Sequence, residues 1–146
     1  MKLYPALFLS LFIVTSFSGE SDFDKALEKA KAEHKLVLLR FTGSDWCVPC
    51  IRMNKEIFEK TSFSDYAENH LVIVEADFPR LKKNRLPEEK QKANDELAEK
   101  YDAEGIFPMV LLLNEKGNVL KTWEGYADMS SDQFISQLKQ FVDDRH

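Results

Sequence analysis

Hydrophobic residues recur at regular intervals along most of the chain after residue 20. Phe23, Leu27 and Ala30 are spaced three and four positions apart, which predicts an amphipathic helix over residues 21–34. Ser21 and Asp24 have capping-box spacing at its start. Residues 36–42 then form a short, nearly continuous apolar run, which is typical of a strand buried on both faces. A Gly-Ser-Asp turn follows this run. The first half of the chain therefore begins as a helix followed by a central strand.

A second helix is predicted from about residue 47 to residue 60, with Ile51, Ile57 and Phe58 facing inward. The polar segment after it is assigned to no element. Residues 71–76 are another apolar run bounded by turn residues, which predicts a second strand. Helix and strand thus alternate in this part of the chain.

Residues 80–104 are highly charged, and a third helix is predicted within them. Pro87 followed by two glutamates suits a helix N-terminus, because the first turn does not need the missing N–H and its dipole favours acids. Leu97 and Tyr101 mark the apolar face of this helix, and Gly105 ends it. The charged segment therefore separates the second and third predicted strands and contains one helix.

Two strands and a helix complete the chain. Residues 109–113 and 119–123 are apolar runs joined by Asn-Glu-Lys-Gly-Asn turn chemistry, so they are predicted to pair as an antiparallel hairpin. Ser130 and Gln133 have capping-box spacing and open an amphipathic helix that extends to Val142. The order of elements predicts an α/β sandwich whose first strands alternate with helices.

The first eighteen residues differ from the rest of the chain. Residues 3–17 are almost uncharged and apolar, and small residues precede a charged sequence, which is the pattern of a secretory signal peptide over 1–18. An uncleaved membrane anchor is the alternative, but a span needs about 20 apolar residues and this run is shorter and contains Pro5. We expect cleavage after Ser18, a mature chain of 19–146, a periplasmic or otherwise exported location, and no stable membrane insertion.

Composition and charge limit the class of protein. The chain has 146 residues, of which 44% are hydrophobic, and this is enough for one domain with a single core. Its formal net charge is −5, and no Lys/Arg cluster is interleaved with aromatic residues, so no nucleic-acid partner is expected. Basic pairs such as Lys82-Lys83 are interpreted as solvated surface.

Only two cysteines are present, so any disulfide within the chain joins Cys47 and Cys50. As a structural crosslink this pair is a poor choice, because closing so short a loop contributes about 2 kcal/mol against nearly 5 for a loop of about a hundred residues. A zinc site would need four ligands, and His34, His70 and His146 do not have ligand spacing to the cysteines. We therefore expect a redox pair and no metal.

Cys47 lies directly after a buried strand and at the first turn of a predicted helix. Free N–H groups and the helix dipole favour an anion there, and a Cys-X-X-Cys motif at such a place lowers a cysteine pKa from about 8.5 toward 7 or below. Cys50 is nearly one turn later, close enough to attack a mixed disulfide formed at Cys47. The pattern predicts Cys47 as nucleophile and Cys50 as resolving thiol.

These residues carry a resemblance to a known family. Residues 46–50, Trp-Cys-Val-Pro-Cys, follow a hydrophobic strand, and residues 105–108, Gly-Ile-Phe-Pro, precede another; together they resemble the thioredoxin superfamily over most of residues 21–144. The lead-in over residues 41–46 looks like that of bacterial periplasmic thioredoxin-like proteins. The resemblance implies a three-layer α/β/α sandwich with a central mixed sheet of four or five strands, and no cofactor. The family's usual first strand is not evident here.

The resemblance also implies roles for three residues near the cysteines. Pro108 would be a cis-proline facing the two sulfurs, with the backbone at Phe107 left to pair with an extended substrate segment; an ordinary trans proline at a strand start is the alternative. Trp46 would form a flat apolar wall beside the nucleophile, although it could equally belong to the core. Trp46, Phe107 and Pro108 are thus the candidate substrate-binding residues.

Two departures from the family stand out. Thioredoxins carry a buried acid on the strand before the motif that helps deprotonate the resolving cysteine, whereas Arg40 and Phe41 occupy the nearest positions here. Glu75 could take that role if its side chain points toward Cys50; a strand-end or surface carboxylate is the alternative. The second departure is length, since residues 80–104 lengthen the segment before the proline and either shape partner choice or form an extended solvated helix.

The leading functional hypothesis is thiol:disulfide exchange on exported proteins, as a reductase or isomerase that draws electrons from a membrane partner. The Val-Pro dipeptide between the cysteines favours reduction, because no histidine is present there to stabilise a thiolate. The alternative, from a different class, is a noncatalytic thioredoxin-fold binding module or chaperone whose disulfide stays closed.

Overall fold

A computed structural model describes residues 21–101 and 105–143. The predicted signal peptide and the start of the mature chain lie outside these residues. The elements, in chain order, are α1 (Asp22–Glu33), β1 (Leu36–Thr42), α2 (Val48–Met53), the π-helical turn η1 (Asn54–Phe58), α3 (Thr61–His70), β2 (Leu71–Asp77), the 3₁₀ turn η2 (Lys82–Asn84), α4 (Glu88–Tyr101), β3 (Met109–Leu113), β4 (Val119–Glu124) and α5 (Ser131–Asp143).

The four strands form one mixed sheet in the order β2-β1-β3-β4. β1 and β2 are parallel, with Leu36 opposite Leu71 and Thr42 opposite Asp77. β3 is antiparallel to both β1 and β4, which confirms the predicted hairpin. Because β1 and β2 run in the same direction, both end at the same edge of the sheet. The loops that follow them therefore start side by side.

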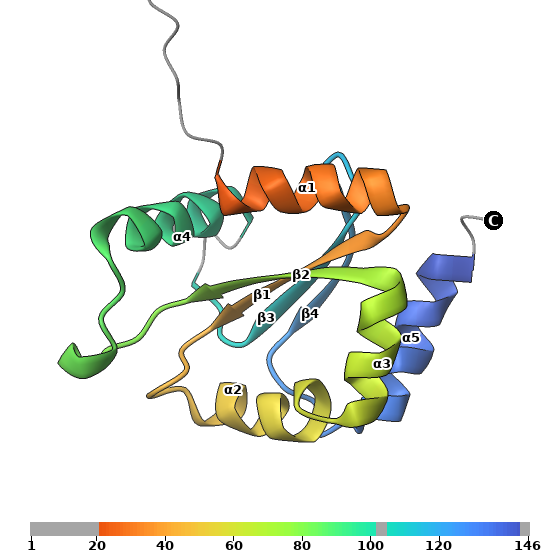
Figure 1. Ribbon diagram of the computed structural model, residues 1–146. Helices are drawn as coiled ribbons and strands as arrows, with labels where there is room; N and C mark the ends of the chain where they lie inside the picture. The colour runs from red at the N-terminus through yellow and green to blue at the C-terminus, as the bar shows by residue number, and fades with distance from the viewer. Residues whose placement is uncertain (1–20, 102–104, 144–146) are drawn as a thin grey trace, which may run out of the picture.

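Helices cover both faces of the sheet, as Figure 1 shows: α1 and α4 lie on one face, and α2, α3 and α5 on the other. The alternation of side chains along β1 explains the two cores. Leu36 and Leu38 belong to the cluster beneath α2, α3 and α5, whereas Val37 and Leu39 belong to the cluster beneath α1 and α4. The expected three-layer α/β/α sandwich with a four-stranded sheet is confirmed.

One sequence prediction about the elements was wrong, and one helix was missed. The helix expected over residues 47–60 is a short α-helix that widens into the π-helical turn η1, and Ile51 is 36% exposed instead of facing inward. The segment left unassigned after it is helix α3, which buries Phe63 and Ala67. These two are one helical turn apart, but polar neighbours made that short apolar stripe hard to distinguish from a loop.

Side-chain caps begin the first and last helices as predicted. The Ser21 hydroxyl accepts from the Asp24 N–H at 3.1 Å, and the Asp24 carboxylate accepts from the Ser21 N–H in return. Ser130 and Gln133 make the same reciprocal pair before α5. Such boxes satisfy two N–H groups that a helix start leaves unpaired.

Among the described residues, no helix is long and apolar enough to cross a membrane.

Candidate active site

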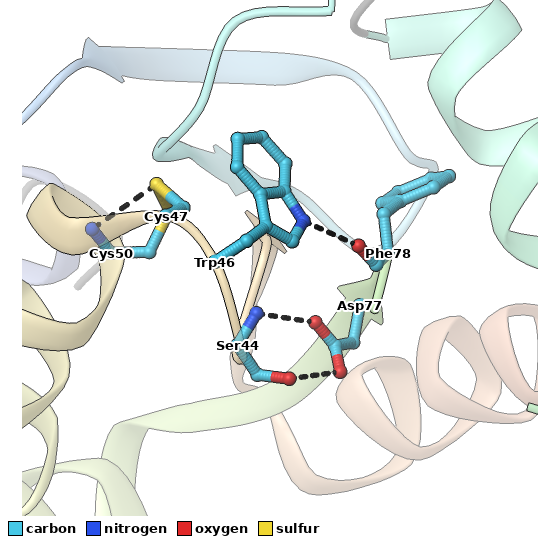
Figure 2. The surroundings of a disulfide bond; sticks show 6 residues. All are labelled: Ser44, Trp46, Cys47, Cys50, Asp77 and Phe78. Atoms are coloured by element: carbon cyan, nitrogen blue, oxygen red, sulfur yellow. Dashed lines mark hydrogen bonds between the residues drawn. A yellow bond between two sulfur atoms is a disulfide. The ribbon is translucent and has the colours of Figure 1, made fainter. Parts of the chain in front are cut away.

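A disulfide joins Cys47 and Cys50 at the start of α2, at the edge of the sheet where β1 ends (Figure 2). Cys47 is the N-cap of the helix, and its sulfur accepts a hydrogen bond from the Cys50 N–H at 3.3 Å. Pro49 lies in the first turn, where its missing N–H costs no helical hydrogen bond. Both cysteines are almost fully buried, whereas Val48 between them is 66% exposed. The motif thus presents Val48 to solvent beside a largely covered disulfide.

The loop between β1 and α2 is fixed to the end of β2. The carboxylate of Asp77, the last residue of β2, accepts from the Ser44 N–H at 2.9 Å and from the Ser44 hydroxyl at 2.6 Å (Figure 2). The Cys47 N–H donates to the Gly43 carbonyl at 2.9 Å, which closes the turn. Asn94 of α4, fully buried, donates to the Asp77 carbonyl. The position of Cys47 therefore depends on three neighbouring elements.

Trp46 lies between the disulfide and Phe78 in Figure 2. Its indole N–H donates to the Phe78 carbonyl at 2.8 Å, and its ring meets the edge of the Phe107 ring at a centroid distance of 5.6 Å. Gly43 permits this packing, because a Cβ there would lie 2.4 Å from the indole ring. Trp46 is half-buried between the loop that carries Cys47 and the segment after β2.

Pro108 is buried one residue before β3, and the Phe107–Pro108 peptide bond is cis, as the family resemblance implies. Met109, the next residue, is paired with Phe41 near the end of β1. Pro108 therefore lies at the same edge of the sheet as the loop that carries Cys47. Phe107 packs against both Trp46 and Phe78, at centroid distances of 5.6 and 5.5 Å. The candidate substrate-binding residues Trp46, Phe107 and Pro108 are thus brought together at one edge.

Cys50 borders a cavity of about 240 Å³ on the α2 side of the sheet. Arg40 and Glu75 also line it, and their side chains form an ion pair across β1 and β2. The Arg40 guanidinium also donates to the Asn54 amide oxygen at 3.3 Å and lies 4.0 Å from the centre of the Phe58 ring. Burial lowers the pKa of Arg40, and the Glu75 carboxylate opposes that effect. The cavity beside Cys50 is therefore polar and charged.

Comparison with known proteins places this arrangement in a family. A family model described as a thioredoxin-like domain matches residues 23–142. The chain belongs to the thioredoxin superfamily. Within that superfamily it is a thiol:disulfide oxidoreductase, because the matched domain carries the two cysteines at Cys-X-X-Cys spacing, joined in a disulfide, and its relatives include a disulfide bond reductase.

Three similar proteins illustrate the relationship. The chain is 38% identical over 117 residues to the disulfide bond reductase DsbH of Chlamydia pneumoniae, covering 80% of this chain and 68% of that protein. It is 28% identical over 131 residues to the thioredoxin-related protein DsbJ of the same organism, but spans only 37% of it. A solved structure of a DsbH oxidoreductase matches with a TM-score of 0.74 at 36% identity, covering 84% of this chain and 83% of that one.

Arg40 and Phe41, the two residues nearest to the expected buried acid, face opposite sides of the sheet. Phe41 faces the core beneath α1 and α4, whereas Arg40 faces the cavity beside Cys50. Of these two residues, the one on the Cys50 side is therefore a cation. Glu75, the candidate for proton handling, lines the same cavity but is paired with Arg40 and is 45% exposed.

Sequence reasoning missed several residues that support the thioredoxin-like site. No role was predicted for Asp77, yet its carboxylate holds Ser44. Asp45 accepts three hydrogen bonds from the segment after β2, and the Phe78 carbonyl holds Trp46. A usable signal was present, since parallel strands end at the same edge of a sheet and the residues that follow β1 and β2 must therefore meet there.

Proposed function

We propose that this chain reduces or isomerises disulfide bonds of exported proteins, using the dithiol form of Cys47 and Cys50. The observation that carries the proposal is the placement of the Cys47–Cys50 disulfide at the start of α2, beside Trp46, Phe107 and Pro108. The relative DsbH is named a disulfide bond reductase, which supports reduction as the direction. A purely structural crosslink would gain little from so short a loop.

The proposed reaction moves two electrons from the chain to its substrate. The Cys47 thiolate attacks one sulfur of the substrate disulfide, the bond between the substrate sulfurs breaks, and the second substrate sulfur leaves as a thiolate that takes up a proton. The Cys50 thiolate then attacks the Cys47 sulfur, which forms the Cys47–Cys50 disulfide and releases the first substrate sulfur as a thiol. The substrate disulfide has been reduced and the dithiol oxidised.

We further propose that substrate recognition uses the edge of the sheet next to the disulfide. The position of Pro108 at this edge, the wall formed by Trp46 and the exposed Val48 support this placement. An extended substrate segment would lie along the backbone at Phe107, with its disulfide over Cys47. The predicted signal peptide would export the chain, and a thiol:disulfide exchange protein in the membrane would then return two electrons to the disulfide.

Glu75 is proposed to help remove the proton of Cys50, together with Arg40. Support comes from the cavity that these two residues share with Cys50, and from the exposure of Glu75, which links that cavity to solvent. The Arg40 cation favours a negative charge on the neighbouring sulfur, and Glu75 offers a proton acceptor at the solvent side. Charge beside the cavity would thus serve the step that the buried acid serves in thioredoxins.

Single-turnover reduction of a cystine peptide tests the proposal. The reduced protein should reduce the peptide, Cys50→Ser should stop at a mixed disulfide through Cys47, and Cys47→Ser should show no reaction. This protein, expressed from its full sequence, should also be recovered outside the cytosol with an N-terminus at Gly19. If the native disulfide resists mild reductants and Cys50→Ser traps no substrate, a noncatalytic binding module becomes the better explanation.

A further inference from the structure

A short basic segment lies between β2 and α4. Residues 80–85 contain four cations and no acid, although the whole chain carries a net charge of −5. All six residues are exposed. None of these four cations belongs to the ion pairs found within residues 21–101 and 105–143. The members of this basic segment are Arg80, Lys82, Lys83 and Arg85, with Leu81 and Asn84 between them.

The basic segment is held in place by the residue just before Trp46. The Asp45 carboxylate accepts from the Arg80 N–H at 2.9 Å, from the Leu81 N–H at 3.0 Å and from the Asn84 side-chain amide at 3.0 Å. These hydrogen bonds lower the pKa of Asp45. Figure 1 shows that the segment projects from the edge of the sheet at which the loop between β1 and α2 also lies. The Asp45 carboxylate therefore holds the basic segment in a fixed position, which a loop that is merely solvated would not require.

The cations begin at Trp46, the residue that precedes the proposed nucleophile. The Arg80 guanidinium lies 3.5 Å from the centre of the Trp46 ring, and Trp46 precedes Cys47 in the chain. The N–H of the same indole ring donates a hydrogen bond to the Phe78 carbonyl, which fixes the ring. Arg80 therefore extends the wall beside the disulfide with a positive charge, and Lys82, Lys83 and Arg85 continue that charge outward.

We propose that the basic segment is a docking surface for an acidic stretch of the protein substrate that flanks its disulfide. Positive charge next to the reactive sulfur raises the rate of encounter with substrates of opposite charge and disfavours basic ones. Glu88 and Glu89 follow in the first turn of α4 and offset part of the charge, but four cations precede them. The proposal rests on thiol:disulfide exchange at Cys47 and adds a rule for which substrates react fastest.

Three peptides that differ only in charge test this rule. Each contains one cystine, flanked by glutamate, glutamine or lysine, and each is mixed with the fully reduced protein. At about 20 mM salt the glutamate peptide should react roughly five- to tenfold faster than the glutamine peptide, and the lysine peptide more slowly than either. At about 1 M salt, where the Debye length is about 3 Å, the three rates should converge.

Two variants separate the basic segment from overall charge. Replacing Lys82, Lys83 and Arg85 by glutamine should bring the glutamate and lysine peptides to similar rates and leave the glutamine peptide unchanged. Three exposed cations on α1, β4 and α5 provide the matched control with the same change in net charge, and that variant should keep the preference; they are Lys29, Lys121 and Lys139.

The outcomes also separate this rule from the exchange reaction itself. Equal rates for all three peptides in the native protein, or a preference lost equally in the control variant, would overturn docking by the basic segment while leaving exchange intact. If no peptide is reduced, the exchange proposal fails. In that case, binding of a cysteine-free glutamate peptide, measured by fluorescence anisotropy, tests the docking surface separately. Binding of vesicles rich in phosphatidylglycerol without any peptide preference would assign the segment to a membrane surface and overturn the proposal.

Discussion

The loop that carries Cys47 and the cavity beside Cys50 are built from different kinds of contact. Around Cys47, aromatic rings and hydrogen bonds that hold the loop to the end of β2 set the geometry, through the Asp77 carboxylate that binds Ser44 and the Phe78 carbonyl that holds Trp46. Beside Cys50, charged and polar side chains do so, through the contacts of Arg40 with Glu75 and Asn54. The contacts around Cys47 hold a loop at the protein surface, whereas those beside Cys50 place charged side chains near its sulfur.

This difference matches the different tasks that we propose for the two sulfurs. In the proposed reaction Cys47 meets a large partner in one orientation, which requires a rigid loop and an apolar wall. Cys50 loses a proton in that reaction and attacks a neighbour within the protein, which depends on local electrostatics more than on access. Changes on the Cys47 side should therefore alter which substrates react, and changes on the Cys50 side should alter the resolving step.

The largest effect is expected from Arg40→Met, which removes the charge beside Cys50 and keeps the side-chain volume. The ion pair with Glu75, the hydrogen bond to Asn54 and the ring contact with Phe58 are lost together. We expect a loss of about 2–3 kcal/mol in the free energy of unfolding, less than for a fully buried pair because Glu75 is half exposed. Urea unfolding of the oxidised protein measures this.

Stopped-flow kinetics of the same variant sharpen the comparison. Formation of the mixed disulfide at Cys47 should keep its rate, whereas its resolution by Cys50 should slow by about tenfold or more. Arg40→Lys should restore part of the resolving rate because it keeps the charge, and Glu75→Gln should cost less than about 1 kcal/mol of stability. Equal slowing of both steps in Arg40→Met would show that the two sides are not functionally separate.

A smaller effect is expected from Gly43→Ala on the Cys47 side. The new Cβ would lie 2.4 Å from the Trp46 ring, which is held by its hydrogen bond to the Phe78 carbonyl and cannot simply swing away. We expect a loss of about 1–2 kcal/mol and slower attack on substrate, with the resolving step unchanged.

A double-mutant cycle with Trp46→Ala identifies the cause of this loss. If the clash with the indole ring destabilises Gly43→Ala, the same substitution should cost almost nothing once the ring is removed. An equal cost in both backgrounds would place the strain in the backbone of the turn instead. The midpoint and slope of urea denaturation, measured for all four proteins, give the coupling energy.

The fold was largely predictable because its strong patterns are local. The four apolar runs are the four strands, and the capping boxes at Ser21 and Ser130 open the first and last helices. Helix α3 was missed because only Phe63 and Ala67 form its buried stripe within a polar sequence. The π-helical turn after α2 was missed as well, since no residue pattern distinguishes it from a regular helix.

The candidate site was predictable only where one segment carries the whole signal. Cys47, Cys50 and Trp46 share five consecutive residues, so their proximity needs no knowledge of the fold. The contacts of Asp77 with Ser44 and of Arg40 with Glu75 join residues more than thirty positions apart. Both pairs depend on the register of β1 against β2, which hydrophobic pattern alone does not fix.

The smallest effect on stability is expected from Asp45→Asn, which keeps the shape of the clamp on the basic segment but removes its charge. The amide N–H groups of Arg80 and Leu81 would then meet a neutral acceptor, or an amide donor if the side chain turns over. Hydrogen exchange at these two amides should become faster, and the preference for the glutamate peptide should decrease, while the resolving step by Cys50 stays unchanged.

The pH dependence of the native clamp has a definite sign. Because hydrogen bonds to its carboxylate lower the pKa of Asp45, the stabilisation is fully present above the ordinary aspartate pKa of about 3.9 and is lost as the pH falls through the lower folded value. Amide shifts of Arg80 and Leu81 in an NMR titration should follow this loss and be flat in Asp45→Asn. A midpoint above about 3.9 would contradict a charged clamp, and the charge of Asp45 would then play no part in holding the basic segment.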